Sequence, residues 1–409
     1  MGGLAAAHAG TCSKAVDRTR TCSPWLIPCS RAGNSERALA DITSAPLRKT
    51  SLYENHVKLG ARMVPFTGFS MPVQYSGVTE EHKAVRTACG LFDVSHMGEL
   101  EMRGVYAGQV VNYLVTNDIG KLEDGHAIYT CCCNPEGTIL DDLIVYRATK
   151  DRYMIVCNAS NHDKIAAVFA AAAKEHCEFV DRTDETALIA LQGPNAMRVL
   201  DKAGDVRHVL ALPAFGFADA RILNVDVTIA RTGYTGEDGV EIFCPWDDAP
   251  RVWEGLMQLG QEHGIKPCGL AARDTLRLEC KMALYGNDID ETTNPLEAGL
   301  AWTVKFDKGD FVGREVLMNV KEHGVRRKLV GFEMTGRGIA RHGYPIKSAK
   351  GEVIGAVTSG SPSPTLGKNI GLGYVPVGND AIGTPILVDC RGKDVEAVIV
   401  KTPFYKRAK

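Results

Sequence analysis

The chain has 409 residues, a length that suggests two or three domains with several hydrophobic cores. Its formal net charge of -2 leaves no basic surface for nucleic acid or an anionic membrane, and no apolar run is long enough to span a bilayer. The 13 cysteines form no CxxC pair and no zinc-like spacing with histidine, so we expect free thiols in a reducing compartment and no metal site.

Residues 1–46 mix small residues with scattered arginines, show no sustained periodicity and contain few acids. We predict an irregular N-terminal extension and a cytoplasmic location, because no amphipathic helix is visible there. The alternative is a transit peptide, cleaved within residues 1–45, and a location in the mitochondrial matrix. That alternative is favoured by four basic residues, Arg18, Arg20, Arg31 and Arg37.

Regular structure is expected to begin near Thr50. The apolar spacing in the first half of the chain predicts helices over residues 51–59, 80–87, 106–114 and 160–174. The last of these helices has a start like a capping box, formed by Ser160 and Asp163. Strands are predicted over residues 92–102, as an antiparallel run over 127–156, and over 186–191.

The second half continues with strands and helices and then changes character. Strands are predicted over residues 220–230 and 239–244, with helices opening at Pro194 and Pro250 and covering 270–278. From about Lys328, short strands alternate with Gly/Pro turns, a pattern typical of a separate all-β module, either a barrel or a jelly roll. The charged stretch 305–328 is the predicted connection.

Two adjacent acids, Asp141 and Asp142, lie within residues 137–146, which otherwise read as an apolar strand. Strand side chains alternate, so the two carboxyls should point to opposite apolar faces, and at least one should be partly buried. An ionised carboxylate is costly to bury without a partner. The acid is therefore either satisfied by a turn or an arginine, or used chemically. The same alternation splits Cys131-Cys132-Cys133 over two faces, which argues against a shared metal.

Two further segments could carry chemistry. Residues 230–243 combine three glycines with Tyr234 and Glu241, a pattern that fits either a ligand-binding loop or a hairpin loop with solvated acids. In residues 269–280, Arg273 and Arg277 lie four residues apart on one face of a predicted helix. Ordinary side-chain pairing at this spacing on a helix surface would also explain the pattern. No dinucleotide fingerprint, P-loop, GxSxG elbow or HExxH motif is present, so we expect no flavin or nicotinamide.

These segments together resemble the aminomethyltransferase family, the T-proteins of the glycine cleavage system. The resemblance runs in order from about residue 48 to the C-terminus, without a large gap. It rests on Phe66-Thr-Gly-Phe-Ser-Met-Pro72, Phe92-Asp-Val-Ser-His-Met-Gly-Glu99, Ile139-Leu-Asp-Asp-Leu143, Arg231-Thr-Gly-Tyr-Thr-Gly-Glu-Asp-Gly239, Ala272-Arg-Asp-Thr-Leu-Arg-Leu-Glu279 and Pro403-Phe-Tyr405.

The resemblance implies an α+β fold with three domains in a cloverleaf-like arrangement around a central folate cleft. The first, folate-binding domain is expected to be discontinuous, formed by residues 47–100 and 187–300. A second α+β domain, residues 101–186, carries the acidic pair. Residues 301–409 form a C-terminal β-rich domain that resembles a barrel or a jelly roll.

The resemblance also implies a reaction. A one-carbon unit passes from an aminomethyl group on the dihydrolipoyl arm of a lipoylated carrier protein to tetrahydrofolate. The products are 5,10-methylenetetrahydrofolate and ammonia. The implied partners are thus the carrier protein and tetrahydrofolate, the co-substrate.

Site residues follow from the same resemblance, position by position. Asp142 aligns with the family's essential acid, whereas we expect Asp141 to be structural. Glu241 aligns with the acid that binds the pterin ring, and Arg273 with an arginine that contacts folate. Tyr405 is the expected C-terminal substrate contact. The residues expected to line the folate slot are Met97, Tyr129, Tyr146 and Tyr234.

Met97 would equally suit plain core packing, and His96, on an apolar strand, is expected to be a satisfied structural histidine. Two rival functions share the fold: a folate-dependent demethylase, and a non-catalytic folate-binding protein that assists iron–sulfur assembly. The dehydrogenase relatives of the demethylase carry a preceding flavin domain, which this chain does not show. The iron–sulfur relatives carry a Lys-Gly-Cys-type signature, which the segment Cys268-Gly-Leu-Ala-Ala-Arg273 does not match.

Overall fold

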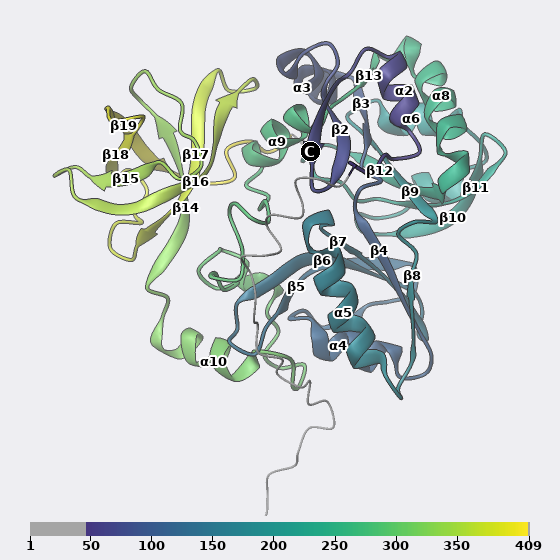
Figure 1. The fold of residues 1–409 in the computed structure, drawn as a ribbon, viewed down its shortest axis with the longest axis horizontal. Helices are drawn as coiled ribbons and strands as arrows, with labels where there is room; N and C mark the ends of the chain where they lie inside the picture. Colours follow the sequence, from purple (N-terminus) through teal and green to yellow (C-terminus); the bar gives the residue numbers. More distant parts are fainter. Residues whose placement is uncertain (1–45, 408–409) are drawn as a thin grey trace, which may run out of the picture.

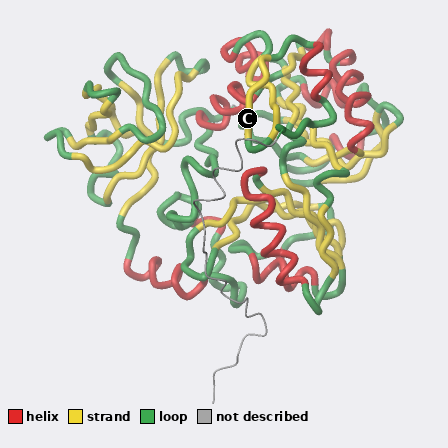
Figure 2. The backbone as a smooth tube through the Cα atoms, viewed as in Figure 1, coloured by secondary structure: helices red, strands yellow, loops and turns green. Residues whose placement is uncertain are grey.

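The structure is a computed structural model that describes residues 46–407 (Figure 1). The predictions for residues 1–45 therefore lie outside the described residues. Two lobes of mixed helix and sheet lie together, and a β-barrel stands beside them, joined through α10 (Arg314–His323) (Figures 1 and 2). Over residues 46–407, no helix combines the length and apolarity that crossing a membrane requires.

The first lobe contains a six-stranded sheet in the order β10-β11-β12-β9-β3-β13. Its strands are β3 (Cys89–Asp93), β9 (Thr186–Gln192), β10 (Phe217–Ile222), β11 (Val225–Ala230), β12 (Gly239–Pro245) and β13 (Ile265–Pro267). A hairpin lies beside it, formed by β1 (Arg62–Phe66) and β2 (Phe69–Gln74). The helices of this lobe are α2 (Tyr53–Lys58), α3 (Val78–Thr87), α6 (Ala196–Asp201), α7 (Arg207–Leu210), α8 (Ala249–Leu259) and α9 (Leu270–Glu279).

The second lobe contains a five-stranded sheet in the order β5-β6-β7-β4-β8. Its strands are β4 (Gly98–Arg103), β5 (His126–Cys133), β6 (Ile139–Thr149), β7 (Arg152–Cys157) and β8 (Glu178–Asp181). Leu100 and Met102 of β4 point to the face covered by α4 (Ala107–Leu114) and α5 (His162–Ala173), because apolar side chains of both helices pack there.

The other face of this sheet packs toward the first lobe through a buried apolar layer. We call it the intersheet layer; it consists of Val85, Phe92, Val94, Ala127, Tyr146, Val156, Leu188, Ala190, Phe217, Ala230, Phe243, Cys268, Ala272 and Leu276. Because strands from both sheets and the helices α3 and α9 contribute to it, this layer fixes how the two lobes meet. Of the predicted site residues, Tyr146 belongs to this layer and Met97 packs against it.

The predicted all-β module after Lys328 is confirmed as a closed barrel in the strand order β14-β17-β16-β15-β18-β19. Its strands are β14 (Arg327–Met334), β15 (Pro345–Ser348), β16 (Val353–Ser363), β17 (Lys368–Pro376), β18 (Pro385–Asp389) and β19 (Asp394–Val400). Closure pairs every edge of the sheet, which explains why short strands with many turns form a stable unit here.

Buried polar contacts attach the barrel to α9. The guanidinium of Arg277 binds the carboxylate of Asp288 at 2.6 Å and donates to the Ser359 hydroxyl of β16 at 2.8 Å. His82 of α3 contacts the Thr365 hydroxyl of the barrel at 2.8 Å. The tail then returns to the first lobe, where the Tyr405 amide donates to the carbonyl of Glu279 at 2.8 Å.

The prediction of a single strand over residues 92–102 is wrong, because this segment contributes to two strands, β3 and β4, which belong to two different sheets. The Asp93 carboxylate accepts the Ser95 amide at 2.9 Å, and the Met97 amide donates to the Val94 carbonyl at 3.1 Å. These bonds turn the chain between the sheets. We call residues 94–97 the crossover.

The predicted capping box at Ser160 and Asp163 is also wrong. The helix α5 begins at His162 after a short 3-10 turn, and its N-cap residue, Asn161, makes no side-chain cap. The Asn161 amide instead donates to the buried carboxylate of Asp141 at 2.5 Å. The boundaries proposed for the three domains remain a prediction, although the sheets change between β3 and β4 and again between β8 and β9.

Candidate active site

Asp141 is a fully buried acid on β6, held by asparagines from the segment that follows β7. Its carboxylate accepts the Asn158 backbone amide at 3.0 Å, the Asn158 side-chain amide at 2.8 Å and the Asn161 side-chain amide at 2.5 Å. Burial, together with the charge of Asp142, raises the pKa of Asp141 to about 8 despite these donors. The contacts suit the structural role expected for Asp141.

Asp142 is the more accessible member of the pair. The Tyr129 hydroxyl donates to one carboxylate oxygen at 2.9 Å, and the Asn158 side-chain amide donates to the other at 2.8 Å. Burial raises the pKa of Asp142, although both hydrogen bonds oppose the shift. The backbone alternates as expected, yet one amide nitrogen, that of Asn158, binds both carboxyls, so the pair acts as one electrostatic unit.

An aromatic stack leads from Asp142 to the surface. The ring of Tyr129 stacks on Trp302 with a centroid distance of 5.6 Å and an interplanar angle of 22°. Trp302 keeps 56% of its surface exposed, whereas Tyr129 is partly covered. A substrate that approaches Asp142 along this stack would meet an apolar surface before the acid.

Glu241 of β12 is buried, with an exposed fraction of 8%. The Thr232 hydroxyl donates to its carboxylate, and the Tyr146 hydroxyl lies 3.4 Å from that of Thr232. Burial raises the pKa of Glu241, whereas Thr232 and the charge of Arg273 lower it. The carboxylate accepts that single hydrogen bond within residues 46–407, so its second oxygen is available to a ligand.

Arg273 of α9 places its guanidinium 4.6 Å from the ring centroid of Tyr234. This guanidinium forms no ion pair or hydrogen bond with any residue of 46–407. The Tyr234 hydroxyl donates to the Ala283 carbonyl, which fixes the ring under the cation. Burial raises the pKa of Tyr234, while the charges of Arg277 and Arg273 lower it and that of Asp142 raises it, so these groups share one neighbourhood. A cation without a partner suits an anionic ligand.

Two residues around the crossover add to this neighbourhood. Met97 is half-buried and packs against the intersheet layer, so both interpretations of it remain open. His96 is buried, but the expectation that it is satisfied is wrong, because its Nδ1 atom has no hydrogen-bond partner among the described residues. Burial and the nearby charge of Arg273 lower the pKa of His96 to about 4, so the ring is neutral at physiological pH.

Tyr405 makes contacts of a different kind. Its hydroxyl donates to Glu237 at 2.8 Å, and the guanidinium of Arg86 lies 4.0 Å from its ring centroid. Arg86 in turn binds the carboxylates of Glu237 and Glu279, both at 2.8 Å. The structure thus joins Tyr405 to a buried ion-pair network of α3 and α9, and its role as a substrate contact stays a prediction.

The three consecutive cysteines of β5 divide as alternation predicts. Cys131 and Cys133 belong to one apolar cluster, and Cys132 belongs to the core beneath α4 and α5. Burial raises the pKa of the Cys132 thiol to about 12 and also raises those of the other two. Buried protonated thiols are poor nucleophiles, so these residues act as small core side chains.

Four residues of the candidate site were not predicted from the sequence: Asn158, Asn161, Thr232 and Trp302. The two asparagines follow strand β7. Their position as polar residues at the end of a strand next to the acidic strand could have identified them as partners of the two acids. Trp302 had no such signal, because only the folded chain places it against Tyr129.

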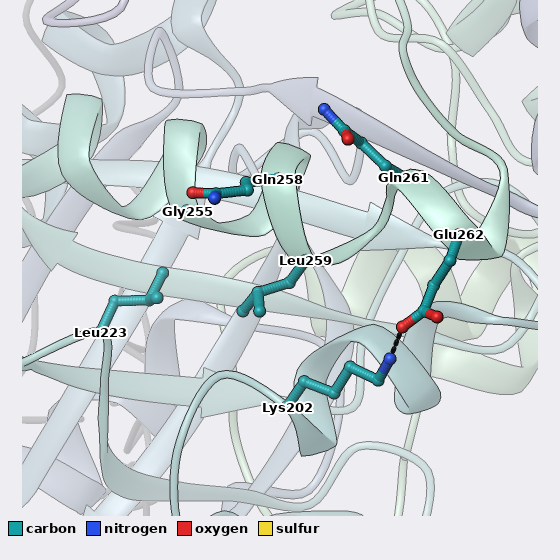
Figure 3. A pocket seen from close by; sticks show the side chains of 7 residues that line it. All are labelled: Lys202, Leu223, Gly255, Gln258, Leu259, Gln261 and Glu262. Atoms are coloured by element: carbon teal, nitrogen blue, oxygen red, sulfur yellow. Dashed lines mark ion pairs between the residues drawn. The ribbon is translucent and has the colours of Figure 1, made fainter.

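A surface pocket of about 460 Å³ lies elsewhere in the first lobe (Figure 3). It is lined by side chains around α8 and the end of α6, and Figure 3 shows Lys202 and Glu262 joined as an ion pair at its rim. None of the residues predicted from the sequence to form the site lines this pocket. We assign it no role in the chemistry.

The chain is similar to known proteins over nearly all of its described length. Residues 52–308 match the family of the GCVT N-terminal domain, and residues 327–406 match the glycine cleavage T-protein C-terminal barrel domain. Two relatives are the aminomethyltransferases of Halothermothrix orenii, 49% identical over 358 residues, and Bacillus subtilis, 46% identical over 363 residues. Each match covers 88% of this chain and 100% of the relative.

A solved structure agrees with these matches. The crystal structure of glycine cleavage system aminomethyltransferase T from Bartonella henselae aligns with a TM-score of 0.83 and 36% sequence identity. The alignment covers 88% of this chain and 99% of that one. The predicted α+β fold with its C-terminal barrel is therefore confirmed. The chain belongs to the aminomethyltransferase family, the T-proteins of the glycine cleavage system.

Proposed function

We propose that this chain takes the aminomethyl group from the dihydrolipoyl arm of a carrier protein and passes its one-carbon unit to tetrahydrofolate. The products are ammonia, 5,10-methylenetetrahydrofolate and the carrier protein with its dihydrolipoyl thiol free. The contacts around Asp142 are the observation that supports this proposal. Burial raises the pKa of this acid, and Tyr129 and Asn158 donate hydrogen bonds to its carboxylate. The ring of Tyr129 in turn stacks on an exposed tryptophan, Trp302.

Asp142 is the proposed catalytic residue. The transferred carbon lies between sulfur and nitrogen, so breaking either bond leaves positive, iminium-like charge on it. A carboxylate fixed by two hydrogen bonds stabilises that charge without reorganising, and can accept a proton from the attacking folate nitrogen. Asp141 keeps the strand and Asn158 in place.

Glu241, Arg273 and the aromatic residues form the proposed folate site. The pterin ring presents an amino group and a ring N–H side by side, and a carboxylate can accept both. Glu241 has one carboxylate oxygen free to accept a hydrogen bond from the pterin. Arg273 is a buried cation that is available to bind an anionic group of the ligand. Flat rings bind well against apolar side chains, a role for which we propose Met97, Tyr129, Tyr146 and Tyr234.

The proposed function is tested directly with purified protein, tetrahydrofolate and an aminomethylated lipoyl carrier protein. We expect ammonia and methylenetetrahydrofolate to appear in equal amounts, and neither to appear without the carrier. If an N-methyl glycine compound supports folate methylation while the aminomethyl carrier does not, the demethylase interpretation replaces this one.

Replacing Glu241 with alanine is expected to weaken tetrahydrofolate binding about 30-fold, because a charged hydrogen-bond acceptor for the pterin is lost. Isothermal titration calorimetry measures the change. Glu333→Ala serves as a control, since Glu333 pairs with Lys368 on the barrel. Equal affinities for Glu241→Ala and the wild type would refute the pterin role.

Replacing Tyr129 with phenylalanine is expected to move the acidic limb of the rate–pH profile to higher pH. Asp142 must be ionised to act, so the rate falls as the solution is acidified through its pKa, which burial raises. The Tyr129 hydroxyl lowers that pKa by hydrogen bonding, and the variant loses this effect. Tyr344→Phe, in the barrel, should leave the profile in place; a limb that moves to lower pH for Tyr129→Phe contradicts the assignment.

A further inference from the structure

Glu99 is a buried acid without a role in the proposed one-carbon transfer. It follows the crossover on β4 and has no exposed surface, yet neither carboxyl oxygen has a hydrogen-bond partner within residues 46–407. In that part of the chain seven buried side-chain N or O atoms lack a partner, and three of them belong to His96 and Glu99. A buried polar group without a partner is destabilising, so such a concentration in four residues calls for a ligand.

The strand geometry sets the direction in which Glu99 points. Leu100 and Met102 of β4 face the core under α4 and α5, so Glu99, which alternates with them, faces the first lobe. Its cross-strand neighbour on β7 is Val156, a member of the intersheet layer. The backbone is held in place, since the Thr183 hydroxyl accepts its amide at 3.0 Å and its carbonyl accepts the Arg182 amide at 2.8 Å.

The surroundings of Glu99 favour its neutral form. Burial raises the pKa of Glu99 well above that of an ordinary glutamate, and the negative charges of Asp181 and Glu241 raise it further. Glu99 and Glu241 both raise the pKa of Tyr146, a residue proposed to line the folate slot, so both acids lie in its neighbourhood. A neutral carboxyl carries one O–H, so in the form that these surroundings favour Glu99 can donate a hydrogen bond.

We propose that Glu99 is a second pterin-binding residue, which donates a hydrogen bond from its carboxyl O–H to the ring carbonyl of folate. This inference rests on the proposed function. Glu241 accepts from the amino group and the ring N–H, and the carbonyl beside them is an acceptor that needs a donor. One charged and one neutral acid together match that donor–donor–acceptor edge, which neither could match alone.

The same strand offers a matched control. Glu101 lies two residues further along β4 and on the same face, but it is paired with Arg103 at 2.7 Å, with Arg182 at 3.2 Å and with Arg152. Arg103 and Arg152 lower its pKa to about 2 against the effect of burial. It is thus a glutamate on the same strand and face whose carboxylate is already satisfied by the protein.

The test uses the full chain and measures the Kd of tetrahydrofolate and of tetrahydropterin by anaerobic calorimetry. For Glu99→Met we expect a Kd about 10-fold weaker for both compounds, because the lost contact is to the ring. For Glu99→Gln, which keeps an N–H donor, and for Glu101→Gln we expect a Kd close to that of the wild type. The Tm of Glu99→Met without folate should stay equal or rise, since an unpaired polar group is removed.

Each outcome is decisive. A folded Glu99→Met protein with the wild-type Kd overturns the proposal and leaves Glu99 a purely structural acid. If Glu99→Met does not fold, infrared spectroscopy decides instead: the protonated-carboxyl band that Glu99→Gln removes must shift when tetrahydrofolate binds the wild type, and an unmoved band overturns the proposal. If the wild type itself binds no tetrahydrofolate, the proposed function fails rather than the role of Glu99.

Discussion

Replacing Asp142 with asparagine is expected to lower the rate of one-carbon transfer by about 100-fold or more while tetrahydrofolate still binds. The amide keeps the size of the side chain and can still accept from the Tyr129 hydroxyl. It carries no negative charge, so the cationic carbon loses its stabilising partner in the transition state. Single-turnover release of ammonia from the aminomethylated carrier measures the effect, and calorimetry measures folate binding.

A good control for this variant is Asp163→Asn, because Asp163 is a fully exposed acid of the same lobe. It should leave both the rate and the folate affinity unchanged. Asp142 would be withdrawn as the catalytic residue if its asparagine variant turned over within about 3-fold of the wild type. A loss of folate binding together with the rate would instead assign Asp142 to folate binding.

The second large effect concerns stability. Replacing Asp288 with alanine is expected to lower the free energy of unfolding by about 3–5 kcal/mol. Both partners of the Arg277–Asp288 pair are almost completely buried, at 1% and 0% exposure. The variant leaves the buried guanidinium with only the partly exposed carboxylate of Asp274, and it also frees the Thr358 hydroxyl and the Leu284 amide. Urea unfolding followed by tryptophan fluorescence measures the loss.

A double variant separates the ion pair from simple loss of packing. Arg277→Met combined with Asp288→Ala removes both charges, so we expect it to be clearly more stable than the sum of the two single variants predicts. Arg221→Met, which breaks an exposed pair with Asp226, should change the stability by less than about 0.5 kcal/mol. Additive effects in the double variant would show that the buried pair contributes no coupling.

Local sequence patterns predicted elements wherever the pattern itself forms the contact. The helix over residues 270–278 appears as α9, and the strand over 186–191 as β9, because each has the apolar periodicity of its own element. The Gly/Pro turns after Lys328 likewise predicted a β module. Prediction failed at the crossover, where the Asp93 carboxylate and the Ser95 amide turn an apolar segment out of one sheet into another.

The candidate site shows the same division. A pair of acids in an apolar strand, a glycine-rich loop and two arginines on one helical face are visible in the sequence, and with the family resemblance they pointed to Asp142, Glu241 and Arg273. Their partners were not visible. Asn158 reaches both carboxyls only because β7 lies beside β6, and Thr232 reaches Glu241 only because β11 lies beside β12.

The sequence by itself determined the family, the all-β character of the C-terminal module and the charged groups proposed for the transfer. Only the tertiary structure decided which of those groups are paired and which are left without partners. Asp141 and Glu101 are satisfied by neighbours, whereas Arg273 and Glu99 are not. The physical reason is that burial and hydrogen bonding set the charge and the availability of a side chain, and both depend on residues distant in the chain.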